Sequence, residues 1–432
     1  MSSEASIELE TSTPAFVGWY EPSRQDPIGV RASEIKGLWR WWSRTCIAGA
    51  MYDLGLLSGY SGSGILLKPR DVEVEAISCF VGKILGLGYV GKDGSEASRF
   101  VIHVEARSQP KLIKLRDLKG AQRLQRPRLL MLERNADVEG IDRGYRFALV
   151  IRRRVSKYSD AEELALRILY MAIQLSGMGK GSRRGMGSLD IVSRDPIIAG
   201  FGDIRELIES VYSDCLKIVE EHKEDCVKYD PKQRSVIPPL PALSKSTYQN
   251  ISVARVYVAK GVEFEKIHNF FLRSERCRAL HKDPKCVDDL RSKFAAWVLG
   301  LPREQRHRKL EGFTGTGTHV LGLPREQLKT GYLIESPNVS RRASPIIISY
   351  HSEKNIFGPG TFIGTFLSGD WPNALRWHGI KQQDRGYKRH VDIRDEDISV
   401  NFQKLVEDYG IAINELEGYL DAVGAQLRAV WP

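Results

Sequence analysis

The groups best suited to binding an anion lie in one glycine-rich segment, GMGKGSRRGMGS at residues 177–188. Five glycines in eleven residues prevent regular structure and let backbone N–H groups approach an anion closely. A lysine and two arginines add cationic donors, which suits a phosphodiester backbone. The alternative is a flexible surface loop without a ligand. The candidate contacts are Gly179, Lys180, Gly181, Ser182, Arg183, Arg184, Gly185 and Gly187.

The glycines also predict that this segment is exposed and packs against little else. Replacing both arginines by alanine should then change stability by no more than about 0.5 kcal/mol. The segment is not a nucleotide-binding P-loop, because glycine rather than serine or threonine follows Lys180.

A second basic site is expected on the first predicted helix, residues 33–50. Ser33 is its predicted N-cap, at a position where free N–H groups and the helix dipole favour a phosphate. Three further cations recur every four residues and therefore share one face of the helix. The candidate contacts in this region are Arg31, Ser33, Lys36, Arg40 and Arg44.

Three tryptophans on the same predicted helix have different expected roles. Trp39 and Trp42 follow the apolar spacing of the helix and are expected in the core. Trp41 lies nearer the basic face and is a candidate for stacking on a nucleic-acid base, although a place in the core is the alternative.

The segment GLGYVGK at residues 86–92 satisfies the dinucleotide-binding pattern GxGxxG but is predicted to be a glycine-rich hairpin. The dinucleotide site needs a helix that starts at the last glycine, whereas the residues that follow have the composition of a turn before a strand. A Walker loop is excluded because Asp93 follows Lys92. No nucleotide cofactor is therefore expected.

No catalytic or metal constellation is visible in the sequence. The nine histidines form no HxxxH pair, and no paired carboxylates stand out. The six cysteines form no CxxC pair, and even Cys277 and Cys286 lack the spacing of zinc ligands. We expect reduced, mostly buried thiols in a cytoplasmic protein, without metal or cofactor.

Composition favours a multidomain globular protein that binds a polyanion. The 432 residues are 42% hydrophobic and 27% charged, which excludes disorder, and no apolar run is long enough for a membrane span. Lysine and arginine number 64 against 54 acidic residues, a net charge of +10. Nucleic acid is the favoured partner before a membrane, and an inert basic surface is the alternative.

The order of predicted elements indicates an α+β fold. Strands are expected at 7–18, 72–80, 99–106, 146–155 and 188–192, with helices at 33–50 and 161–175, the second capped by Asp160. This is the split βαβ, or ferredoxin-like, order. We expect one such domain at residues 1–200 and an acidic helix with a proline-rich linker at 201–249. A second ferredoxin-like domain at 250–432 should end in a long helix that includes Leu405 and Leu427.

Four segments resemble the RAMP superfamily of CRISPR proteins, and within it the first RAMP subunit of the type III-B Cmr complex. They are TPAFVG at 13–18, RASEIKGLWRWW at 31–42, KGSRRGMGSL at 180–189 and RRASPII at 341–347. The resemblance spans both halves of the chain, and its second and third segments are the specific ones. The family usually has an aromatic residue where Met186 stands.

The resemblance implies two fused, RRM-like ferredoxin domains with helical insertions and a glycine-rich loop. It also implies a non-catalytic place at one end of an antiviral complex, beside other RAMP subunits, in contact with the 3′ side of the guide RNA and with target RNA. Family roles extend to Arg341 and Arg342. The alternative is a RAMP endoribonuclease that processes repeat RNA. That function needs a histidine near the first helix, whereas the first histidine here is His103.

Overall fold

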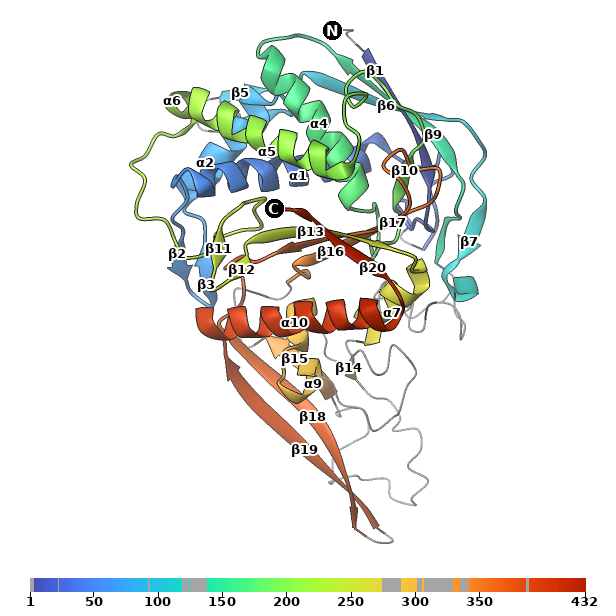
Figure 1. Cartoon of the computed structure of the whole chain (residues 1–432), viewed down its shortest axis with the longest axis vertical. Helices are drawn as coiled ribbons and strands as arrows, with labels where there is room; N and C mark the ends of the chain where they lie inside the picture. Colours follow the sequence, from blue (N-terminus) through green and yellow to red (C-terminus); the bar gives the residue numbers. More distant parts are fainter. Residues whose placement is uncertain are drawn as a thin grey trace.

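Two four-stranded antiparallel sheets organise the computed structural model (Figure 1). It describes residues 4–21, 23–91, 94–118, 124, 138–273, 289–300, 305–306, 329–334, 339, 342–385 and 388–432. Each half of the chain contributes one of these two sheets, and a third four-stranded sheet belongs to the C-terminal half. In each half, the strands of the main sheet and the two helices that accompany them follow the same order, strand, helix, two strands, helix, strand.

The N-terminal sheet has the strand order β10-β1-β9-β6, and all of its neighbouring strands are antiparallel. Numbered along the chain, its four strands stand in the spatial order 4-1-3-2. The elements of this unit are β1 (Glu4–Thr11), α1 (Ala32–Asp53), β6 (Phe100–Ala106), β9 (Arg146–Arg153), α4 (Ser159–Leu175) and β10 (Leu189–Ile191).

The C-terminal sheet, in the order β16-β17-β13-β20, repeats this arrangement. Its strands are again antiparallel and, numbered along the chain, stand in the order 4-1-3-2 when read from β20. The elements of this unit are β13 (Ala254–Lys260), α7 (Phe264–Arg273), β16 (Ile346–His351), β17 (Gly360–Phe366), α10 (Phe402–Ala422) and β20 (Gln426–Trp431).

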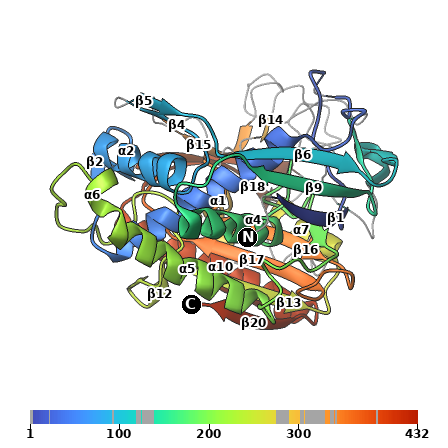
Figure 2. The same cartoon turned by 90° about the horizontal axis from the view of Figure 1, so that it is seen from above.

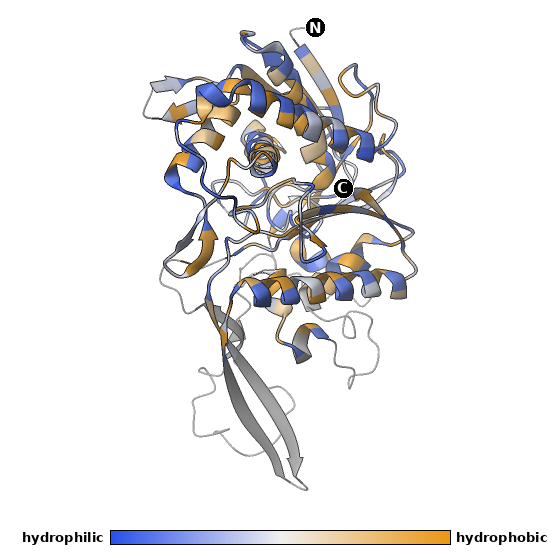
Figure 3. Ribbon diagram, turned by 60° about the vertical axis from the view of Figure 1, so that its left-hand side comes forward, coloured by the Kyte–Doolittle hydropathy of each residue, from blue (hydrophilic) through white to orange (hydrophobic). Residues whose placement is uncertain are grey.

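Helices α1 and α4 lie between the two sheets, and α10 covers the far side of the C-terminal sheet (Figures 1 and 2). One hydrophobic core joins the N-terminal sheet, these helices and the near face of the C-terminal sheet. A second core lies between the far face and α7 and α10. Hydrophobic and hydrophilic residues alternate along α10 (Figure 3), as expected for a helix with one buried face.

The remaining elements decorate these two units, and a long hairpin of β18 and β19 projects from the C-terminal half (Figure 1). They are β2 (Tyr60–Gly62), β3 (Ile65–Lys68), α2 (Asp71–Cys79), the π-helical turn η1 (Phe80–Ile84), β4 (Tyr89–Gly91), β5 (Gly94–Glu96), β7 (Leu112–Lys114), η2 (Leu115–Leu118), β8 (Glu139–Ile141), α5 (Ile204–Glu221), α6 (Lys223–Cys226), β11 (Thr247–Tyr248), β12 (Ile251–Ser252), α9 (Asp289–Ser292), η3 (Ala296–Leu299), β14 (Gln305–Arg306), β15 (Lys329–Ile334), β18 (Ala374–Arg385) and β19 (Lys388–Ser399).

Three sequence predictions about local structure are wrong. Residues 71–79 form helix α2 rather than a strand, because the buried carboxylate of Glu73 accepts hydrogen bonds from Ser58, Gly59 and Arg70 and fixes the first turn. Helix α1 begins at Ala32, so the exposed Ser33 is not its N-cap. Helix α4 begins at Ser159, so Asp160 does not cap it.

The expected terminal helix is also shorter than predicted. Helix α10 ends at Ala422, and Gly424, with a φ of +80°, turns the chain into strand β20. This strand pairs with β13 and buries Trp431 completely. Leu427 therefore belongs to a strand that completes the sheet rather than to the helix.

Candidate nucleic-acid interface

Lys36, Arg40 and Arg44 line one wall of a pocket of about 340 Å³ on helix α1. Trp39 and Trp42, on another face of the same helix, are fully buried as predicted. The indole N–H of Trp39 donates a hydrogen bond to the Ala165 carbonyl oxygen of α4 at 2.6 Å. The indole N–H of Trp42 donates to the hydroxyl oxygen of Ser176, directly after α4, at 2.9 Å. This packing holds the cationic face of α1 towards the pocket.

The opposite wall comes from residues 78–98, which include the segment 86–92 that is predicted to be a hairpin. Strands β4 and β5 do pair as a hairpin, which confirms that prediction. Arg40 fixes the wall to α1, because its Nε and Nη2 atoms donate to the Leu87 carbonyl oxygen at 3.1 Å and 2.5 Å. The lining residues outside α1 are Ser78, Val81, Gly82, Gly88, Tyr89, Val90, Glu96, Ala97 and Ser98.

Gly88 is required where this wall approaches the helix. Its φ is +92°, and a Cβ atom there would lie 3.0 Å from Nη2 of Arg40. A side chain would therefore be strained and would push the wall away from the arginine.

The electrostatics of the pocket favour an anion. Among the described residues, none of Lys36, Arg40 and Arg44 forms an ion pair with a carboxylate. Burial and then the positive charges of Arg40 and Arg154 lower the pKa of Lys36. Burial and Arg40 likewise lower the pKa of Arg44. These cations repel one another, and a bound phosphate would relieve that repulsion.

Arg31 and Trp41 lie outside this pocket. Arg31 is the N-cap of α1 and is paired with Glu34 at 2.9 Å and with Asp26 at 3.7 Å. Trp41 is half-buried, packs edge-on against Phe366 of β17, and carries the Arg183 guanidinium 4.9 Å from its ring centre. Their contacts to RNA stay predictions, as does that of Ser33.

The glycine-rich segment is not the exposed loop that the sequence predicted. It lies between α4 and β10 and packs against the C-terminal half of the chain. Arg183 donates a hydrogen bond from Nη1 to the Ser344 carbonyl oxygen at 2.9 Å. Burial and the nearby charge of Arg342 lower its pKa to about 10, which Asp370 partly offsets. Exposure was inferred from composition, and composition does not show which groups meet a loop in the fold.

Arg184 and His268 extend this contact between the two halves. Arg184 donates to the carbonyl oxygens of Leu299 and Ile346, and its guanidinium lies 4.6 Å from the ring centre of Phe271. Nδ1 of His268 lies 2.7 Å from the Arg184 carbonyl oxygen. Because a carbonyl oxygen only accepts, Nδ1 must carry a proton. Burial lowers the pKa of His268 to about 4, so its ring is neutral at pH 7.

The glycines of the segment serve close packing within the protein. Gly179, Gly181, Gly185 and Gly187 all have φ between +66° and +78°. A Cβ atom on Gly187 would lie 2.2 Å from the Met178 carbonyl oxygen. Contacts of Gly179, Lys180, Gly181, Ser182, Gly185 and Gly187 with RNA stay predictions; the side chains of Lys180 and Ser182 are half-buried.

The structure describes one member of the late arginine pair. Arg341 lies outside the described residues. Arg342 is 7% exposed, and it binds Asp370 at 2.8 Å and stacks 4.5 Å from the ring centre of Trp371. Its guanidinium therefore holds together the loop after β17. Arg183, Arg184, His268 and Arg342 together form what we call the interdomain cluster.

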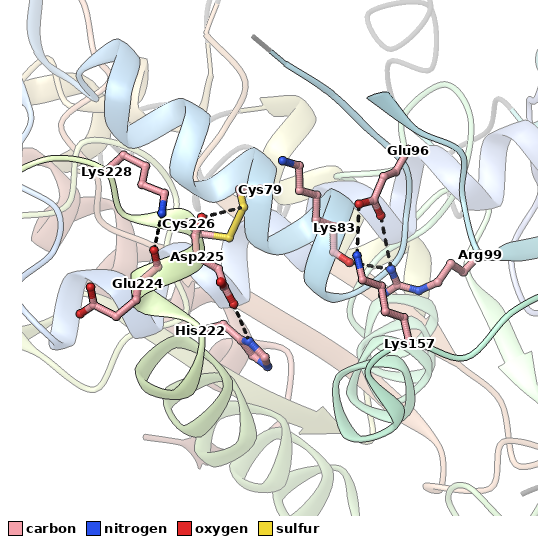
Figure 4. Close-up of a disulfide and its surroundings, with 10 residues drawn as sticks. All are labelled: Cys79, Lys83, Glu96, Arg99, Lys157, His222, Glu224, Asp225, Cys226 and Lys228. Atoms are coloured by element: carbon pink, nitrogen blue, oxygen red, sulfur yellow. Dashed lines mark hydrogen bonds and ion pairs between the residues drawn. A yellow bond between two sulfur atoms is a disulfide. The ribbon is translucent and has the colours of Figure 1, made fainter. Parts of the chain in front are cut away.

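A disulfide joins the pocket wall to the following helices, contrary to the prediction of reduced thiols (Figure 4). Cys79, between the lining residues Ser78 and Val81, is bonded to Cys226 of α6. The two cysteines are 147 residues apart, so sequence spacing gave no sign of the pair. Cys46 and Cys215 are free and buried, as expected, and Cys277 and Cys286 lie outside the described residues.

Neither a metal site nor a membrane helix is found within the described ranges. No three histidine, cysteine or carboxylate side chains there are grouped to hold a metal ion. Nor does any helix in that part of the chain have the length and apolar character needed to cross a membrane.

Sequence comparison identifies the N-terminal unit. A family model described as the RAMP superfamily matches residues 8–190, a span that runs from β1 to β10 and includes α1 and the glycine-rich segment. Residues 8–190 are therefore similar in sequence to the RAMP superfamily. No curated protein matches the chain in sequence.

Solved structures with a similar fold cover both halves of the chain. A chain in type III-B Cmr-beta bound to cognate target RNA is 14% identical, with a TM-score of 0.50, and the match covers 95% of this chain and 99% of that one. Apo Cmr1 from Pyrococcus furiosus is 16% identical, with a TM-score of 0.48 and coverage of 99% and 98%. At such identity, the first of these matches shows a shared fold.

Proposed function

We propose that this protein is a non-catalytic RNA-binding subunit of a type III-B CRISPR ribonucleoprotein in the cytoplasm. Its partners would be guide RNA, target RNA and other RAMP subunits. The RAMP match over residues 8–190 and the fold shared with a chain of Cmr-beta bound to target RNA support this assignment. A position at the 3′ side of the guide is part of the proposal.

The matching strand order of the two halves supports a duplicated architecture. We infer that residues 1–200 and 250–432 are two ferredoxin-like domains, since each has the βαββαβ order and the 4-1-3-2 sheet. The segment between them is more than a tether, because α5 packs into the core beside α1 and α4. The proline-rich stretch crosses α1, where Leu243 donates its N–H to the Thr45 carbonyl oxygen at 2.9 Å.

One observation supports RNA binding at the α1 pocket most directly: its cations have no carboxylate partner among the described residues. Lys36 and Arg44 face a pocket closed on its far side by glycine-containing backbone. Such a pocket suits a phosphate of a nucleic-acid backbone, because it offers charge without steric bulk. Every cation of the interdomain cluster, by contrast, already has partners within the protein.

The test is RNA binding by a Lys36→Ala, Arg44→Ala double variant. Each charge-assisted phosphate contact contributes roughly 1.5 kcal/mol or more before screening, so affinity for single-stranded RNA should fall at least about tenfold. A Lys217→Ala, Lys232→Ala variant is the matched control, because it also removes two positive charges, but from exposed side chains of α5 and the linker.

The same samples separate binding from processing. Labelled repeat RNA incubated with the purified protein should remain intact with and without metal. Cleavage that disappears when one histidine is replaced by alanine would instead identify the protein as an endoribonuclease. Unchanged RNA affinity in the Lys36, Arg44 variant would exclude this pocket as the RNA site.

A further inference from the structure

The α1 pocket is bounded on two sides. A site that contacts only the phosphodiester backbone of RNA does not require a second wall. Helix α1 supplies its cationic side, and the turn from α2 into η1 together with the β4–β5 hairpin supplies the other. The far wall is preformed, since the N–H groups of Leu87 and Gly88 donate to the carbonyl oxygens of Val81 and Gly82 at 3.2 Å and 3.3 Å. The volume of about 340 Å³ lies within the range of small-ligand sites.

The far wall is chemically suited to the flat face of a base. Opposite the cations the lining consists of the mostly buried Val81 and Gly82 and the exposed Ala97, which are apolar or small. Nearby, the exposed Val90 extends this apolar surface at the hairpin, where 87% of the residue is accessible. A continuous phosphodiester backbone has no use for such a surface, whereas an unstacked base gains by packing on it.

The pocket has positive charge on its α1 side and a carboxylate on its hairpin side, which would orient a bound nucleotide. Glu96 lies on the hairpin side, where Arg99 at 3.7 Å and Lys157 at 3.4 Å partly neutralise it (Figure 4). Its carboxylate repels a phosphate but can accept a hydrogen bond from an exocyclic amino group. A nucleotide would therefore place its phosphate at Lys36 and Arg44 and its base towards the hairpin.

We infer that this pocket receives one nucleotide of a single-stranded RNA, with its phosphate on α1 and its base against residues 81–82 and 97. The inference rests on the proposed RNA-binding function and adds to it a binding site for an individual nucleotide. The protein then binds the RNA backbone by charge, and the bound nucleotide fixes the position of the RNA along the protein.

The first test measures binding of nucleoside 5′-monophosphates to the full-length protein by calorimetry. A monophosphate should bind at least about tenfold more tightly than either inorganic phosphate or the matching nucleoside, since only the complete nucleotide uses both walls. Equal affinity for inorganic phosphate and the monophosphates would overturn the inference and leave a simple anion site.

The second test fills the pocket without changing its charge. An Ala97→Phe variant should lower monophosphate affinity at least about tenfold, whereas Ser95→Phe should not, because Ser95 lies on the same hairpin but does not line the pocket. Circular dichroism and the melting temperature verify that both variants fold. Nucleotide binding that survives in a folded Ala97→Phe variant would overturn the inference.

A third measurement locates the nucleotide within an RNA. Linear and circular forms of one short RNA are titrated into wild type and Ala97→Phe. Weaker binding of both forms shows that an internal nucleotide occupies the pocket, and weaker binding of the linear form alone shows a terminal one. If the Lys36→Ala, Arg44→Ala variant binds RNA more weakly while the Ala97→Phe variant keeps its affinity for both RNA forms, the proposed function stands and the nucleotide-binding site is rejected.

Discussion

The α1 pocket and the interdomain cluster contain the same kinds of side chain but use them in opposite ways. In the cluster, Arg183 and Arg184 donate to carbonyl oxygens of the C-terminal half and stack on aromatic rings. In the pocket, Lys36 and Arg44 have no such partners among the described residues. A cation whose donors are satisfied within the protein stabilises the fold, and one whose donors face a pocket is available to a ligand.

The largest expected effect is on stability and concerns the cluster. An Arg183→Ala, Arg184→Ala variant should lose about 3–5 kcal/mol of unfolding free energy, because three charge-assisted hydrogen bonds and two stacking contacts disappear. Urea denaturation with matched m values measures the loss. The Lys36→Ala, Arg44→Ala variant is the comparison, with an expected change within about 0.5 kcal/mol. A loss below 1 kcal/mol in the cluster variant would remove the distinction between the two regions.

The cluster should also respond to acid, because His268 is buried as a neutral ring. Its folded-state pKa of about 4 lies below the ordinary histidine pKa of 6.5. The unfolded chain therefore binds the proton first, and the stability due to His268 is full above pH 6.5 and is lost as pH falls towards 4. The loss approaches about 3 kcal/mol.

Chemical denaturation at pH 7, 5.5 and 4.5 measures this dependence in wild type and in His268→Gln. The glutamine amide can still donate to the Arg184 carbonyl oxygen but does not titrate in this range. The difference in stability between the two proteins should therefore shrink or reverse as pH falls. Parallel pH profiles would show that His268 does not contribute to acid sensitivity.

Salt dependence should separate the two regions in RNA binding. Removing two phosphate contacts at Lys36 and Arg44 should lower the slope of log affinity against log salt by about 1.4. The cluster variant, measured at a temperature where it stays folded, should keep the wild-type slope. A shallower slope in the cluster variant would show that the glycine-rich segment contacts RNA as well.

The smallest expected effect concerns Arg40, which both faces the pocket and is hydrogen-bonded within the protein. It lines the pocket and also donates twice to the Leu87 carbonyl oxygen. Arg40→Lys keeps the charge but loses the paired donors, so stability should fall by about 0.5–1.5 kcal/mol and RNA affinity by less than about threefold. Thermal denaturation and RNA titration measure the two effects. A tenfold loss of affinity would show that Arg40 contacts RNA directly.

Local patterns in the sequence determined much of the fold. Alternating residues located strands β6 and β9, and the apolar spacing of Trp39 and Trp42 identified the buried face of α1. The four-residue recurrence of Lys36, Arg40 and Arg44 likewise placed three cations on one face. Such features depend on helical and strand geometry alone, which repeats within a few residues and is legible without knowledge of the rest of the chain.

Only the tertiary structure decided which cations are available to a ligand. The sequence favoured Arg183 and Arg184 because glycines surround them, yet residues more than 110 positions further along the chain satisfy their donors. It predicted a hairpin at residues 86–92, and β4 and β5 do pair as one, but it did not reveal that this hairpin forms the second wall of a pocket on α1. Partner identity across such distances is a property of packing, and packing is not encoded in the composition of either segment.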